Sequence, residues 1–140
     1  MRSHSRNLQI GQSIIEVSFI VILFPLFLAG VFDLGSVFQT SIVITNAAEE
    51  GARYLSSNPY DKEDDFEGTL AAAQREASSS SVPLGIGEIS VTLCTDAADP
   101  VGCDSGTTVE ITVTKSVSLI TSFILSEPLS LSSSARMYVP

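Results

Sequence analysis

The chain has 140 residues, enough for one small domain or for a domain with an anchor. It carries 7 Lys and Arg against 16 Asp and Glu, a formal net charge of −9. That acidic balance argues against a nucleic-acid-binding protein, which needs a basic surface. The chain has two Cys and a single His, which is residue 4. It therefore lacks the residues for a zinc site built from Cys and His, and a His-based catalytic triad could not be formed without this N-terminal His. Carboxylates remain, but no nucleophile with a base is recognisable, so we expect no enzyme, no metal and no cofactor.

An apolar run extends from Ile14 to Phe32, with Glu16 as its only charged residue. About 20 apolar residues in a helix cross the hydrocarbon core of a bilayer, so the run predicts a single membrane-spanning helix. Two arginines precede it, whereas residues 33–140 carry a net charge of −10, and the positive-inside rule therefore places the N-terminus in the cytoplasm. A cleavable secretory signal is the alternative. The run is longer than the apolar core of such signals, so we favour a retained anchor.

A short motif stands at the beginning of the apolar run. Gly11, Gln12 and Glu16 follow a basic leader, and this arrangement resembles a type IV prepilin processing site. The resemblance implies that a membrane aspartyl peptidase cuts after Gly11, that Gln12 becomes the new N-terminus, and that Glu16 neutralises a neighbouring subunit's amine. Such a pair offsets part of the cost of burying both charges. On charge alone, Glu16 fits equally well as a carboxylate at the lipid headgroups without a partner.

Two further motifs narrow this resemblance. After the first motif come Gly30, Asp33 and Gly35, and then Asn46, Ala47, Ala48, Gly51, Ala52 and Arg53. In this order and at these spacings, the three motifs resemble the TadE-like family of pseudopilins, which are found with tight-adherence (Flp-type) pilus systems. Glu49 departs from the family, which usually has a basic residue there. The resemblance implies a role in pilus assembly, with a prepilin peptidase, other pilins or pseudopilins, the assembly machinery and the lipid membrane as partners.

Residues 33–57 are expected to continue the membrane helix. Apolar and small side chains recur there at helical spacing on one face: Val37, Ile44, Ala48, Gly51 and Leu55. That face narrows to Ala48, Gly51 and Ala52, and small residues permit a close approach of helices. The face either docks on another subunit's helix or packs against this chain's own domain. Asn58 and Pro59 predict the end of the helix, since the residue before proline avoids the α conformation.

The remaining sequence predicts a helix and a small sheet. The acidic run 61–67 fits the first turn of a helix that reaches about Ser78, because acids are favourable there, and it fails the EF-hand pattern for calcium. Residues 89–93 and 109–113 alternate apolar and polar, as half-buried strands do, and residues 129–139 resemble a last strand that pairs with them. The fold class predicted is α+β and pilin-like: a long N-terminal helix that continues into a domain with a second short helix and an antiparallel sheet.

The two cysteines lie in the loop between the first two predicted strands. Outside the cytoplasm, Cys94 and Cys103 are expected to form a disulfide. A loop this short would contribute about 2–3 kcal/mol in the chain-entropy account. Three aspartates crowd the same loop, and we interpret them as solvated acids rather than as a calcium site.

The chain thus divides into a leader at 1–11 that is expected to be cleaved, a transmembrane segment at 12–33 and an extracytoplasmic domain at 34–140. The predicted function is that of a minor pilin or pseudopilin in the cytoplasmic membrane, with its C-terminal domain outside. The alternative is an unprocessed, single-pass, membrane-anchored binding domain. The N-terminus of the mature protein distinguishes the two.

Overall fold

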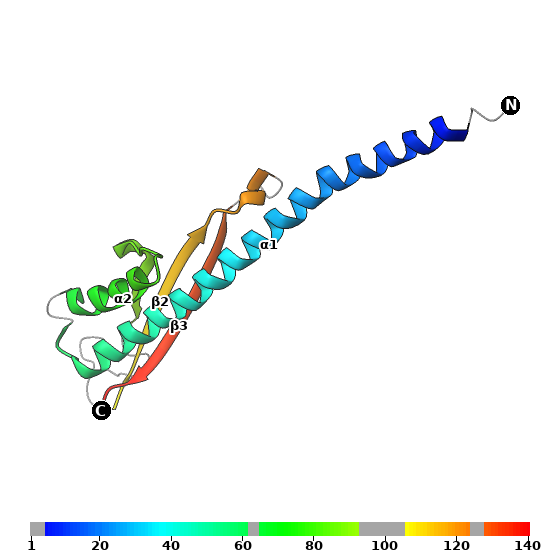
Figure 1. Ribbon diagram of the computed structural model, residues 1–140. Coiled ribbons are helices and arrows are strands. Elements are labelled where there is room, and N and C mark those ends of the chain that lie inside the picture. The colour runs from blue at the N-terminus through cyan, green and yellow to red at the C-terminus, as the bar shows by residue number, and fades with distance from the viewer. Residues whose placement is uncertain (1–4, 62–64, 93–105, 124–127) are drawn as a thin grey trace.

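Figure 1 shows the computed structural model, which describes residues 5–61, 65–92, 106–123 and 128–140. A long first helix, α1 (Ser5–Ser57), is followed by the short helix α2 (Glu67–Ser79) and a three-stranded antiparallel sheet. The predicted α+β class is therefore confirmed, with its long helix, second short helix and small sheet.

Helix α1 has two halves in different surroundings. Its N-terminal half protrudes alone, and its C-terminal half lies along the sheet, with the two chain termini at opposite ends of the molecule (Figure 1). Pro25 lies inside the protruding half without ending the helix. Large apolar side chains there are exposed: Ile14, Ile15, Val17, Phe19, Ile20, Val21, Ile22, Leu23, Phe24, Leu26, Phe27, Leu28, Val31 and Phe32. In the part of the chain that the structure describes, α1 is the helix long and apolar enough to cross a membrane.

The sheet is built on its middle strand. Strand β2 (Thr108–Val117) pairs antiparallel with β1 (Ile89–Thr92) on one side and with β3 (Leu129–Tyr138) on the other. Side chains of β2 alternate between the two faces, so that Val109, Ile111 and Val113 are fully buried on one of them. The sequence predicted all three strands, and β3 matches its predicted range to within one residue, whereas β2 extends to ten residues, beyond the predicted 109–113.

The core fills the space between the C-terminal half of α1, helix α2 and the inner face of the sheet. Its members are small or branched residues: Val43, Ile44, Ala47, Ala48, Ala52, Leu55, Ala73, Ala77, Leu84, Ile89, Val109, Ile111, Val113 and Val139. Alanines on both helices let their backbones come close together, and the branched residues of β2 fill the rest. Helix α1 ends at Ser57, immediately before the Asn58-Pro59 pair that predicted its end.

Helix α2 begins at Glu67, the last residue of the acidic run, so the rest of the run precedes the helix instead of forming its first turn. The residue before it, Phe66, has left-handed backbone angles (φ 62°) and gives no side-chain cap. The cap comes instead from Asp61, whose carboxylate accepts hydrogen bonds from the Gly68 and Thr69 amides at 3.1 and 2.7 Å and from Thr69 Oγ1 at 2.5 Å. One acid of the run therefore satisfies the first amides of α2 directly.

Two short 3-10 turns complete the described structure: η2 (Ile86–Glu88) before β1, and η3 (Ile120–Phe123) between β2 and β3. The predicted disulfide between Cys94 and Cys103 lies outside the described residues, as do the aspartates of that loop. The pairing therefore receives no support from the structure.

Candidate functional site

The first motif lies on the protruding half of α1. Gly11 is inside the helix, and Gln12 and Glu16 are exposed one turn apart. Gln12 Nε2 donates a hydrogen bond to Glu16 Oε1 at 3.2 Å. The position expected to become the new N-terminus and the glutamate expected to pair with an amine thus share one helix face. Glu16 has no cationic partner within the described part of this chain.

In the second motif, the aspartate and the two glycines lie in different surroundings. Asp33 is buried, with 7% of its surface exposed. A Cβ atom added at Gly30 or at Gly35 would meet nothing within 4 Å. These two glycines therefore serve no packing within the chain, and they leave shallow, open places on the surface of α1 where another backbone can approach closely.

Asp33 caps the turn η3 at the tip of the β2–β3 hairpin. Its Oδ1 accepts a hydrogen bond from the Ile120 amide at 2.6 Å, and its Oδ2 accepts from the Thr121 amide at 2.8 Å and from Thr121 Oγ1 at 2.5 Å. Both carboxylate oxygens are used, as they are in the Asp61 cap of α2. Asp33 therefore ties the end of the hairpin to the point where the apolar run ends.

The small residues of the third motif point into the chain's own domain. Ala47, Ala48 and Ala52 are fully buried. A Cβ atom at Gly51 would lie 3.4 Å from Ala73 Cβ and 3.5 Å from Ile111 Cγ2, which is ordinary contact with α2 and β2. Of the two roles considered for this face, packing against the chain's own domain is the one these contacts describe, and none of these four residues is free to meet a partner.

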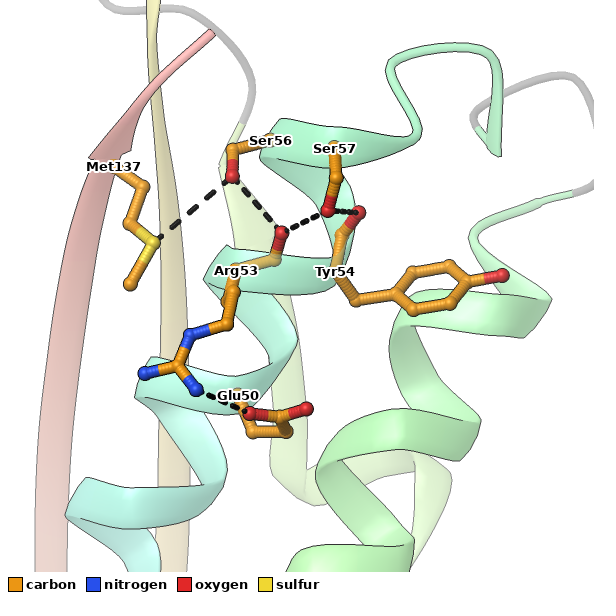
Figure 2. Close-up of polar contacts among 6 residues, drawn as sticks. All are labelled: Glu50, Arg53, Tyr54, Ser56, Ser57 and Met137. Carbon is orange, nitrogen blue, oxygen red and sulfur yellow. Dashed lines mark hydrogen bonds and ion pairs between the residues drawn. The ribbon is translucent and has the colours of Figure 1, made fainter.

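The polar residues of the same motif face outward. Asn46, Glu49, Glu50 and Arg53 line a hollow of about 230 Å³ together with Glu76 of α2. Arg53 pairs with Glu50 at 3.2 Å in an exposed contact (Figure 2). Such a pair contributes little to stability because solvent screens it. The three glutamates outnumber the arginine, so the hollow is acidic.

Serines close the C-terminal end of α1 (Figure 2). The hydroxyls of Ser56 and Ser57 both donate to the carbonyl of Arg53, at 2.9 and 2.6 Å, and Ser57 also donates to the Tyr54 carbonyl at 3.2 Å. The Tyr54 carbonyl also accepts from the Asn58 amide at 2.9 Å and from Asn58 Nδ2 at 3.0 Å, so side chains reinforce the last turn of the helix. The Ser56 hydroxyl also lies 4.0 Å from the sulfur of Met137 on β3, so the helix end is held against the sheet.

Two ion pairs fix the polar edges of the sheet. Lys115 Nζ lies 2.9 Å from Glu88 Oε2 and 2.7 Å from the Pro83 carbonyl oxygen. Partial burial raises the pKa of Glu88. The hydrogen bonds from Lys115 and from the Gly85 amide lower it by more than burial raises it, so the pKa lies below its usual value. On the outer face, a hydrogen bond from Arg136 lowers the pKa of Glu110.

Sequence reasoning missed the contacts that join distant segments. Asp33 meets residues 87 and 88 positions away, and Thr45 Oγ1 lies 3.0 Å from Ser133 Oγ. The available signal was an acid immediately after an apolar run, paired with a Thr that follows a strand. The sequence does not show which residues this acid contacts, because the contact depends on how the β2–β3 hairpin lies against α1.

Comparison with known proteins adds one match. No curated protein and no solved structure matches the chain. A family model described as TadE-like protein matches residues 11–53, the stretch that carries all three motifs. This confirms, over this stretch of α1, the resemblance drawn from those motifs.

Proposed function

We propose that this chain is a TadE-like pseudopilin or minor pilin that takes part in assembling a tight-adherence, type IV-like pilus. The observation that carries the proposal is the family match over residues 11–53. A family associated with such pili is not an enzyme family. Membership would also explain the protruding apolar helix, which would serve as a membrane anchor. In this proposal, α1 anchors the chain in the cytoplasmic membrane, with its N-terminus in the cytoplasm and its domain outside.

Processing is the second part of the proposal. A prepilin peptidase cuts after Gly11, and Gln12 becomes the N-terminus of the mature chain. The motif supports this, as does the position of Gly11 one residue before the exposed Gln12–Glu16 pair. The amine so formed stands at the start of an apolar helix, where an unpaired charge costs several kcal/mol in a fully apolar setting. A neighbouring subunit's Glu16 offsets part of that cost.

Assembly occurs through the half of α1 that the domain leaves free. The open surface at Gly30 and Gly35, together with the exposed apolar side chains before them, supports contact with other pilins or pseudopilins. The buried alanines of the third motif support the subunit's own fold instead.

Co-purification from membranes tests the proposal. Glu16→Ala and Glu16→Gln should both be inserted and processed, yet recover pilus assembly proteins about tenfold less well or worse, as loss of a charge pair worth over 1.4 kcal/mol requires. Glu67→Gln, an exposed glutamate at the start of α2, is the matched control and should recover them normally. Normal recovery with Glu16→Ala would return Glu16 to an interfacial carboxylate without a partner.

Cleavage is tested separately. Gly11→Leu should block it and leave a precursor in the membrane that is longer by the leader. Processing of Gly11→Leu at the normal rate would contradict the assignment of this glycine.

A further inference from the structure

The tip of the β2–β3 hairpin lies at the level where the apolar run of α1 ends. The Ile120 amide lies 2.6 Å from the carboxylate of Asp33, and Asp33 is the first charged residue after that run. Residues beside Asp33 on α1 are strongly exposed, Phe32 at 67% and Leu34 at 71%. When α1 spans a bilayer, η3 is therefore held at the bilayer surface.

The turn η3 itself carries no charged residue and exposes an apolar side chain. Ile120 exposes 62% of its surface, and Leu129, which pairs with Val117 across the hairpin, exposes 41%. The sequence contains no charged residue between Lys115 and Glu127, although the domain as a whole is strongly acidic. Large exposed apolar side chains are stabilised by an apolar environment, and the carboxylate of Asp33 is already occupied by the amides and the hydroxyl of η3.

We propose that η3 is a second membrane contact, in which Ile120 inserts into the lipid interface and Asp33 holds it there. The occupant of this surface is lipid, because exposed apolar side chains of α1 lie on both sides of Asp33, with Phe32 before it and Leu34 and Phe38 after it, so that the tip lies beside apolar helix surface. The inference rests on the anchoring part of the proposed function. A single helix leaves the domain free to tilt and rotate about its axis, whereas a second contact fixes the orientation of the sheet relative to the membrane.

The absence of Trp from the chain gives a direct test with single-Trp variants of the full-length protein. Ile120→Trp reports on the tip and Phe24→Trp, 58% exposed in mid-run, reports on the anchor. Tyr138→Trp is the control, because it is 63% exposed and lies at the other end of β3, roughly 30 Å away at about 3.3 Å per residue. Each variant is reconstituted into phosphatidylcholine vesicles with plain or brominated acyl chains.

The proposal predicts that brominated lipid quenches the fluorescence of Phe24→Trp and Ile120→Trp by about twofold or more, as expected for a side chain in the acyl-headgroup boundary. Tyr138→Trp should be unaffected. Quenching of Phe24→Trp without quenching of Ile120→Trp would overturn the second contact and leave the anchor in place. The same result is expected if a protein, and not lipid, covers the tip. No quenching of Phe24→Trp would overturn both.

A double variant tests the role of Asp33. Asp33→Ala in the Ile120→Trp background removes the cap of η3 and should reduce the quenching toward that of Tyr138→Trp, while Asp61→Ala, which removes the equivalent cap of α2, should not. Undiminished quenching with Asp33→Ala would overturn the positioning role of this residue.

Discussion

Two aspartates hold the start of two helical segments through the same set of contacts. Asp33 and Asp61 each accept two backbone amides and one threonine hydroxyl. The amides at a helix start have no partner of their own, and a charged acceptor satisfies them better than a neutral one. Each aspartate thereby fixes an element that is remote in sequence, η3 for Asp33 and α2 for Asp61.

Removing either carboxylate should loosen its own element and leave the other intact. Asp33→Ala is expected to speed amide hydrogen exchange at Ile120 and Thr121 by about tenfold or more, because a hydrogen bond to a charged group contributes roughly 1.5–3 kcal/mol. Asp61→Ala should do the same at Gly68 and Thr69. Exchange measured by mass spectrometry checks this. Equal exchange at Ile120 in both variants would show that Asp33 does not cap η3.

The Glu88–Lys115 pair makes stability depend on pH in the acid range. The pKa of Glu88 is lowered in the folded chain, so its contribution is fully present above the unfolded-state pKa of about 4.3 and disappears as pH falls through the folded value. Glu88→Gln should therefore lower the unfolding temperature at pH 7 and flatten its decline toward acid pH. Thermal unfolding of both forms between pH 7 and pH 3 measures this, and parallel curves would exclude a role for the pair.

At the scale of elements, glycines on the helices differ in what surrounds them. A Cβ atom at Gly68 would lie 2.5 Å from Tyr54 and 2.7 Å from Asp61 Oδ1, so alanine there must displace the ring and the cap together. At Gly30 the same atom meets nothing within 4 Å. Gly68 is therefore closely packed, whereas Gly30 has open space around it.

Matched alanine substitutions separate the two positions. Gly68→Ala should lower the free energy of unfolding by about 1–3 kcal/mol through overpacking. Gly30→Ala should leave it unchanged or raise it, since alanine favours a helix interior by about 1 kcal/mol. Thermal unfolding in detergent compares them. A stable Gly68→Ala with an intact α2 would contradict the packing described here.

The sequence predicted most of these elements because their signals are local. Asn58 and Pro59 end α1, and alternation reveals the buried positions of β1 and β2. The extension of β2 to Val117 was missed because Thr114, Lys115 and Ser116 interrupt its apolar alternation, and this part of the strand is held by pairing with β3. The small-residue face of α1 stayed ambiguous because alanine and glycine suit any close partner, and only the positions of Ala73 and Ile111 settle which one they meet.

At the scale of the molecule, the proposed function gives the two halves of α1 separate roles, one in folding and one in assembly. Its C-terminal half is the spine of the domain core, and its N-terminal half offers exposed apolar surface. Ala48 is fully buried in the first half, and Gly35 lies open near the junction. Substitutions at these two positions should therefore fail in different ways.

Leucine substitutions test this division. Ala48→Leu should destabilise the domain by about 1–3 kcal/mol, because the core has no room for it. Gly35→Leu should unfold at the normal temperature but recover fewer assembly partners, because a bulky side chain blocks close helix approach. Unfolding temperature and co-purification are measured on the same preparations. Normal partner recovery with Gly35→Leu would place the assembly surface elsewhere.

The mass of the mature chain tests the central claim most directly. We expect intact-mass analysis and N-terminal sequencing of the protein, extracted from membranes of cells that assemble the pilus, to show a chain beginning at Gln12. A prepilin-type pseudopilin must lose residues 1–11 before its amine can meet a neighbour's Glu16. A membrane-embedded chain that still carries residues 1–11 in assembled pili would contradict the account.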